Sequence, residues 1–421
     1  MIIILSVMSY LTWLIFRNKM GFILYQLLCA TTYLVSLSFI QTLDITLPIY
    51  FVFSALPFLK SFKANHLFSL TVLLYFSAVI LISLLINSVN SVISIFIIRL
   101  AGILLFYYIF SHVDFKLKAK PWHLALSFAC EILLTVIGFA LSKDYRLMLN
   151  FQCTVGCIAT GFVLLLAYDF YKNQKRFSLV LMLLHTLIAC LSGTRGYMLV
   201  CIVVTMTSIL LFSSLKQKLV ALPLLLAGVL MERFNVMEFI FHSLRFGEST
   251  GRRQSEDLFV IRFMPKRPLF NILFGNGFGS PIGKYRISRS IIYEVADSRY
   301  TLKVLPKVEG FHNCWSTILY SSGIVGLILI VLLYGSIILQ AMRAATDNRF
   351  RMILLSFLVS YAVLLWFRWT ATSGILEFAC LSYVIHDLKN HNRAEQLSLS
   401  RAESCQIQKK TEERSWTSYS P

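Results

Sequence analysis

Long apolar runs separated by short polar connections constrain the fold of this chain more than any other feature. Many of these runs approach the 20 or so residues that a helix needs to cross a bilayer. Of the 421 residues, 57% are hydrophobic and only 14% are charged. Because a bilayer admits only segments that satisfy their own backbone hydrogen bonds, the sequence predicts an all-α polytopic membrane protein.

About 13 apolar runs are candidates for transmembrane helices. They cover residues 1–16, 20–40, 45–59, 66–86, 91–111, 121–141, 147–170, 177–191, 197–215, 219–231, 313–340, 352–367 and 371–387. The runs 45–59 and 219–231 are short, so a tilted, re-entrant or interfacial placement stays open for each. We therefore expect about 12–13 spans. Residues 1–16 lack a basic leader and a small-residue cleavage site, which favours a retained span.

The distribution of lysine and arginine predicts the orientation of these helices. A net charge of +19 would suggest a nucleic-acid partner in a soluble protein, but here the cations lie mostly in alternate short connections. The odd-numbered connections carry 15 of them and the short even-numbered connections carry four. Since cytoplasmic loops are the ones enriched in lysine and arginine, we expect the odd-numbered connections and the tail 388–421 in the cytoplasm. Residues 232–312 then lie outside, and no nucleic-acid partner is expected.

The external loop 232–312 carries a net positive charge that membrane topology does not explain. Residues 232–312 contain 13 lysines and arginines against 8 aspartates and glutamates. Loops longer than about 60 residues are translocated largely regardless of charge, so the cations are permitted but not explained. An anion on the outer face is the favoured explanation, and a merely solvated basic loop is the alternative.

Two local structures are expected inside the loop. The stretch "SEDLFVIRFM" predicts an amphipathic helix with Leu258, Ile261 and Phe263 on its apolar face and Asp257 and Arg262 elsewhere. "PKRP" ends it, and "FGNGFGS" at 274–280 predicts a tight glycine turn. As a nucleotide-binding motif the turn is weak, because no Lys-Ser/Thr follows it.

Three arginines are candidates for binding an anion. Arg195 lies in "LSGTRGYML" at an external helix end, where it is either a snorkelling residue or a guanidinium fork suited to phosphate. Arg252 and Arg253 precede the predicted amphipathic helix. Cations are unfavourable near a helix N-terminus, and an anion bound there would reverse that penalty.

His312 and Asn313 end the basic loop and begin an apolar run. A lone histidine is more often structural than catalytic. At this position, however, we expect it to be in contact with water, so that it can titrate, and close to a lipid-borne substrate. With a pKa near 6.5 it is suited to act as a general base. Asn313 is expected to orient His312 or a sugar hydroxyl.

Taken in order, these motifs resemble those of the bacterial O-antigen polymerase and O-antigen ligase superfamily. The matching stretches are "SGTRG" (192–196), "TGRR" (250–253), "LFGNGFGS" (273–280), "HN" (312–313) and "SSGIVGL" (321–327). Their order fits over residues 185–387, whereas the N-terminal half matches only as a set of hydrophobic spans. Ligases of this family are usually drawn with 12 spans and both termini inside, whereas the charge count here puts the N-terminus outside.

The resemblance implies a multi-pass glycosyltransferase of the GT-C type in the bacterial inner membrane. Its parts would be N-terminal transmembrane helices (1–191), further helices (192–231), a large periplasmic loop (232–312), C-terminal transmembrane helices (313–387) and a cytoplasmic tail (388–421). The donor would be a glycan on undecaprenyl diphosphate, used without a metal or other cofactor. Membrane lipid, a chain-length regulator and a flippase are the further partners that this implies.

The family pattern also implies roles for particular residues. Arg195 and Arg252 would contact the diphosphate, and His312 would deprotonate the acceptor hydroxyl. Arg253, Asn313, Arg262 and Arg299 are the expected substrate-binding residues, and the choice between Arg252 and Arg253 for the diphosphate stays open. Arg299 begins a polymerase-like pattern of arginine, ten residues and glycine.

Three functions fit this pattern. The favoured one is an O-antigen or related repeat-unit polymerase, which transfers the growing chain to another lipid-linked repeat unit. The first alternative is an O-antigen ligase that transfers the glycan to lipid A core. The second is a flippase or transporter of the lipid-linked glycan, which would need charges near the bilayer midplane and internal repeats.

Overall fold

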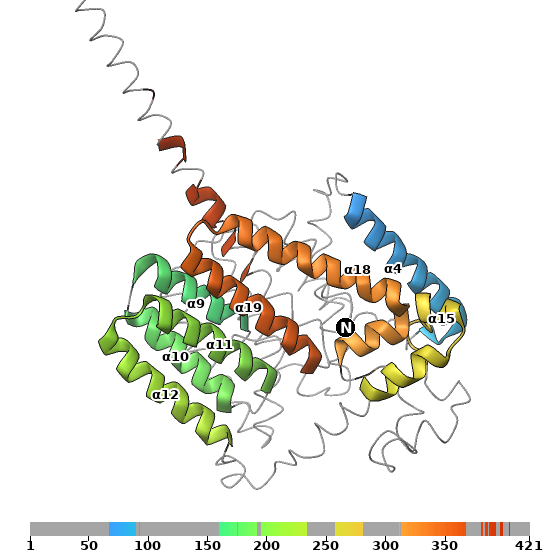
Figure 1. The fold of residues 1–421 in the computed structure, drawn as a ribbon, viewed down its shortest axis with the longest axis horizontal. Helices are drawn as coiled ribbons and strands as arrows, with labels where there is room; N and C mark the ends of the chain where they lie inside the picture. The colour runs from blue at the N-terminus through green and yellow to red at the C-terminus, as the bar shows by residue number, and fades with distance from the viewer. Residues whose placement is uncertain are drawn as a thin grey trace, which may run out of the picture.

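The structure is a computed structural model that describes residues 67–89, 92, 160–174, 176–191, 195–233, 257–280, 311, 313–367, 380–381, 384–385, 387–392, 396–398 and 404. Over these residues the chain is helical and contains no strand, which confirms the expected all-α class for that part. The elements are α4 (Leu67–Ile86), α9 (Thr160–Asn173), α10 (Arg176–Leu191), α11 (Arg195–Phe212), α12 (Leu215–Arg233), the 3₁₀ turn η4 (Met264–Lys266), α15 (Leu269–Phe274), α18 (Cys314–Ala344) and α19 (Asn348–Phe367). Figure 1 shows their arrangement.

The apolar runs of the sequence become helices wherever the structure describes them. The runs 66–86, 177–191 and 352–367 correspond closely to α4, α10 and α19. The short run 219–231 belongs to a longer helix, the 19-residue α12. Among the described helices, Cys314–Ala344 and Asn348–Leu365 are long and apolar enough to cross a membrane, judged by length and composition.

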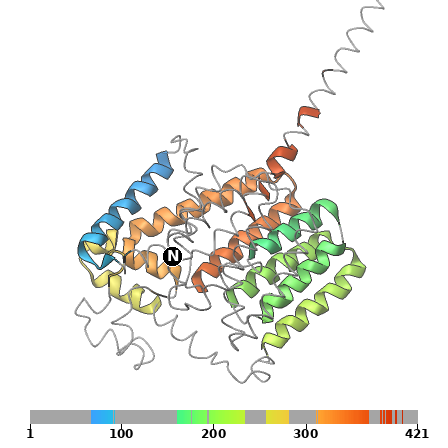
Figure 2. The same cartoon turned by 180° about the vertical axis from the view of Figure 1, so that it is seen from behind.

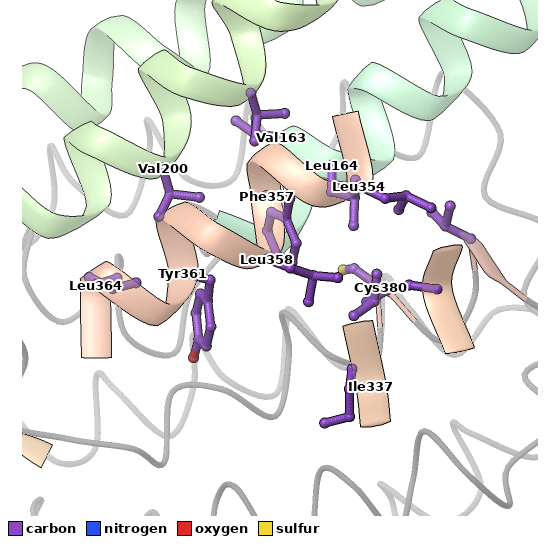
Figure 3. Close-up of a cluster of buried hydrophobic side chains, with 14 of the residues drawn as sticks. Val163, Leu164, Val200, Ile337, Leu354, Phe357, Leu358, Tyr361, Leu364 and Cys380 are labelled. Carbon is purple, nitrogen blue, oxygen red and sulfur yellow. The ribbon is translucent and has the colours of Figure 1, made fainter. Parts of the chain in front are cut away.

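Helices α9, α10, α11 and α12 form a bundle against which α19 packs through α11 and α9 (Figure 1, and from behind in Figure 2). Its interior is filled mostly by aliphatic and aromatic side chains, with a few buried polar groups such as Thr186 and Thr205, whose hydroxyls are 2.7 Å apart. Figure 3 shows this cluster, which draws on α9, α11, α18 and α19 and includes Val163, Leu164, Val200, Ile337, Leu354, Phe357, Leu358 and Tyr361. Close packing of these side chains joins the bundle to α18 and α19.

Aromatic contacts fix which helix ends lie together. The Tyr171 ring stacks on Phe350 with centroids 4.7 Å apart and lies 5.1 Å from the Phe212 ring. The C-terminal ends of α9 and α11 therefore meet the N-terminal end of α19. Beside them, the Lys172 ammonium lies 2.7 Å from the Asp387 carboxylate.

This end of the bundle carries the cations that the charge count assigned to the cytoplasm. The connections that meet here join α9 to α10, α11 to α12 and α18 to α19. Their described lysines and arginines are Lys172, Arg176, Lys216, Lys218, Arg343, Arg349 and Arg351. Connections far apart in the sequence are thus brought to one end, as a shared cytoplasmic side requires.

Helix α18 is not one continuous helix, although the sequence presents 313–340 as a single apolar run. Gly323 interrupts it with φ 67° and ψ −170°. A short arm (314–322) and a long arm (324–344) meet there at an angle, beside α15 and α4 (Figures 1 and 2). The left-handed φ suits glycine, and a Cβ at Gly323 would lie 2.3 Å from the Leu273 carbonyl oxygen.

The break frees backbone carbonyls, and donors from elsewhere in the chain satisfy them. The Asn276 N–H donates to the Tyr320 carbonyl over 2.9 Å, and the Gly277 N–H donates to the Ser321 carbonyl over 3.0 Å. The Tyr75 hydroxyl of α4 donates to the Ser322 carbonyl.

We predict that Gly323→Ala destabilises the protein by about 2–5 kcal/mol, because it combines an unfavourable φ with overpacking. Thermal unfolding of the purified protein measures the change. The matched control is Gly335→Ala in the same helix, where a Cβ would meet nothing within 4 Å. Equal losses of stability in the two variants would refute the assignment of the break to Gly323.

Candidate functional site

A buried hydrogen-bond network joins the external loop to the start of α18. Asp257 begins the described helical segment 257–263, and its Oδ1 accepts from Asn313 Nδ2 over 2.9 Å and from Ser316 Oγ over 2.6 Å. Asp257 is 8% exposed and Asn313 is 1% exposed. A buried carboxylate needs such donors to offset its lost hydration, so the network fixes both segments.

Both neighbours of position 312 are held in place. Asn313 is the N-cap of α18, and its Oδ1 accepts from the Trp315 N–H over 2.8 Å. Thr317 Oγ1 accepts from the Phe311 N–H over 3.0 Å and contacts the carbonyls of Phe311 and Asn313. The Asn313 amide, expected to orient His312 or a sugar, therefore uses one of its two N–H donors and its Oδ1 inside the protein. His312 itself lies outside the described residues.

An aromatic cluster packs the 257–263 segment against this site. Phe259 stacks on Phe263 with centroids 5.1 Å apart, and Phe311 meets Tyr320 edge to face at 5.3 Å. Val260 and Met264 complete the buried group. The short arm of α18 is thus clamped on one side by helix 257–263 and on the other by the glycine turn.

The expected helix at 257–263 is confirmed, but the face assigned to it is only partly buried: Phe263 is 4% exposed and Leu258 packs against the same cluster, whereas Ile261 does not. Ile261 is exposed, whereas Phe259 and Val260 are fully buried. Asp257, placed on the polar side by its charge, is buried instead. The reason is tertiary, because Asn313 and Ser316 offer two donors to Asp257 and thereby turn the helix.

The glycine turn interlocks with two helices. Gly275, Gly277 and Gly279 have φ values of 83°, 86° and 69°, which confirms the expected tight turn. Besides the two N–H groups that reach α18, the Phe278 N–H donates to Ser83 Oγ over 2.8 Å. The N–H groups of Asn276, Gly277 and Phe278 all bond within the protein, so the turn connects α4 to α18. These three groups therefore do not bind a phosphate.

The remaining predicted site residues differ in what the structure shows of them. Arg195 is the first residue of α11, which confirms its expected place at a helix end. Arg262 is exposed on the helical segment 257–263. Arg252, Arg253 and Arg299 lie outside the described residues.

The helix end that begins at Arg195 lies on the same side of the bundle as Asn313. α11 and α19 run antiparallel, since Thr207 Oγ1 lies 3.2 Å from Ser356 Oγ and Phe212 is near the start of α19. Arg195 is therefore level with the C-terminal end of α19. Trp315 Nε1 donates to the Ala362 carbonyl near that end over 3.4 Å, so the start of α18 lies there too.

Sequence reasoning missed Asp257 as the partner of Asn313, and it gave no role to Lys266 and Arg267. The Arg267 guanidinium lies 5.4 Å from the centre of the Phe263 ring. The only available signal was the basic "PKRP" stretch, which was interpreted as a helix terminator. Among the described residues, no three His, Cys, Asp or Glu side chains are grouped so that they could hold a metal ion.

Comparison with known proteins gives no match for this chain, either to a family model or to a curated protein.

We predict that Asn313→Asp destabilises the protein by about 3 kcal/mol, because it sets two buried carboxylates against each other. The double variant Asp257→Asn/Asn313→Asp exchanges the amide and the carboxylate, so it keeps the hydrogen bond and the cap. It should recover most of the lost thermal stability. A double variant as unstable as the sum of its single changes would show that the two side chains do not interact.

Proposed function

We propose that this protein is a polytopic glycosyltransferase of the bacterial inner membrane, specifically an O-antigen or related repeat-unit polymerase. It transfers a glycan from undecaprenyl diphosphate to another lipid-linked repeat unit at the periplasmic face. The observation that carries the proposal is the Asp257–Asn313 hydrogen bond. It ties a residue four positions after Arg253 to the residue that follows His312.

Several features support the membrane placement. Two described helices have the length and composition to cross a bilayer. Their outward surfaces are apolar, and α4 presents a similar surface. The exposed large side chains on these helices include Leu73, Leu74, Leu85, Ile328, Val331, Leu332, Met352, Val359 and Val363. A protein with an apolar core and apolar outer helix faces is suited to a lipid solvent.

The distribution of charge supports the orientation. Cations crowd the end of the bundle where α9 and α11 finish. The opposite end holds the start of α11 at Arg195, the start of α18 and the docked segment 257–263. On a periplasmic side of this kind, the arginines near these positions are available to a lipid diphosphate.

The proposed reaction assigns roles to the candidate residues. Arg195 and Arg252 or Arg253 bind the diphosphate and stabilise its charge as it leaves, while Arg299 contacts the glycan-bearing substrate. His312 takes the proton from the acceptor hydroxyl, and the hydroxyl oxygen attacks the anomeric carbon with inversion. The bond from that carbon to the diphosphate oxygen breaks, and the undecaprenyl diphosphate keeps the electron pair.

A deletion strain tests the reaction class through its lipopolysaccharide. We expect core capped with a single repeat unit, because a polymerase extends repeat units that a separate ligase attaches. Bare core with accumulated lipid-linked polymer would assign the chain to the ligase reaction instead. A lipopolysaccharide banding pattern unchanged from that of the parent strain would exclude both reactions.

Complementing that strain with variants tests His312. We predict that His312→Ala lowers elongation by about 10²–10⁴-fold, the usual contribution of a general base. His391→Ala is the matched control, since His391 is exposed among the described tail residues. Membrane insertion of both variants is checked by immunoblotting. Full-length polymer from inserted His312→Ala protein would remove His312 from the mechanism.

A further inference from the structure

Part of the external loop exposes large apolar side chains. Ile261 is 59% exposed, and in α15 Leu269 is 70%, Phe270 is 63% and Phe274 is 40% exposed. The Phe270 and Phe274 rings lie together, with centroids 5.1 Å apart. Apolar surface of this kind in a loop outside the bilayer marks a binding surface.

Positive charge accompanies these side chains. Residues 258–280 contain Arg262, Lys266 and Arg267 and no aspartate or glutamate. Arg262 and Lys266 are exposed. A short segment that combines apolar and basic side chains is suited to the boundary between lipid head groups and acyl chains.

The same segment is attached to the end of an apolar helix. At the C-terminal end of α4, Ser83 Oγ accepts a hydrogen bond from the Phe278 N–H. Asn87 Nδ2, just beyond α4, donates to the Phe278 carbonyl. Figures 1 and 2 both show α15 beside this end of α4. The nearby α4 residues Leu81, Ile82, Leu85 and Ile86 are exposed and apolar. The surface of α15 thus lies beside a helix face suited to lipid.

We infer that residues 261–274 dock onto an anionic phospholipid leaflet on the external side of the membrane. Ile261, Leu269, Phe270 and Phe274 enter the acyl-chain boundary, and the three cations bind phospholipid head groups. The inference rests on the membrane placement proposed above. It accounts for three of the 13 loop cations that topology leaves unexplained.

This docking has a mechanical consequence for the site. The 257–263 helix carries Asp257 at its start, and α15 leads into the glycine turn that bonds α18. A leaflet that holds residues 261–274 therefore holds both segments that clamp the short arm of α18. The lipid surface becomes part of the support for the residues that flank His312.

Photo-cross-linking of the full-length protein tests the docking. Benzoylphenylalanine replaces Phe270 or Phe274, and the protein is placed in nanodiscs of phosphatidylcholine and phosphatidylglycerol at 3:1. Val331 on the long arm of α18 is the positive control, and exposed Lys389 in the tail is the negative control. We expect phospholipid adducts at 270, 274 and 331 and few at 389.

The two proposals fail in different ways. Adducts at 331 without adducts at 270 and 274 would overturn the docking and leave the membrane placement intact. Absence of adducts at all three positions would overturn both.

The head-group preference is tested by the identity of the adducts at position 270. We predict that the ratio of phosphatidylglycerol to phosphatidylcholine among these adducts exceeds the bulk ratio of 1:3, and that this adduct ratio falls about fivefold in each of the variants Arg262→Gln, Lys266→Gln and Arg267→Gln. The matched control removes Lys216, Lys218 and Arg343 at the opposite end of the bundle and should leave the adducts at 270 unchanged. An adduct mixture that follows the bulk lipid ratio in the parent protein would overturn the assignment of an anionic partner.

Discussion

A helix that breaks in apolar surroundings leaves carbonyl groups that must find donors, and much of the described structure depends on how this chain supplies them. At Gly323 the donors are two backbone N–H groups of the glycine turn and the Tyr75 hydroxyl of α4. An unsatisfied carbonyl in such a place would cost several kcal/mol, so the break exists only because these partners are present. The motifs "FGNGFGS" and "SSGIVGL" are thus two halves of one joint.

The joint separates the short arm of α18 from the long arm and allows the short arm to meet the external loop. Asp257 and the aromatic cluster then hold its N-terminal end. As a result, the residues on either side of His312 belong to a packed and hydrogen-bonded segment.

Where the structure describes them, the helices agree with the apolar runs of the sequence, because an apolar run must satisfy its backbone locally and its length is visible. The break at Gly323 was not predicted, since the apolar run continues through it and nothing local distinguishes this glycine from Gly335. Asn313 as an N-cap agrees with the known preference of asparagine for that position. Its bond to Asp257 was not predictable, because the two residues are 56 positions apart and a carboxylate is expected on the polar face.

The Tyr75 hydroxyl also has a consequence for the order in which the chain is made. Ser322, whose carbonyl accepts this hydrogen bond, leaves the ribosome 247 residues after Tyr75. When the broken helix is synthesised, its partner on α4 has therefore already been made. Helix α4 thus contributes an acceptor-binding hydroxyl that exists before the last described helices complete their backbone hydrogen bonds.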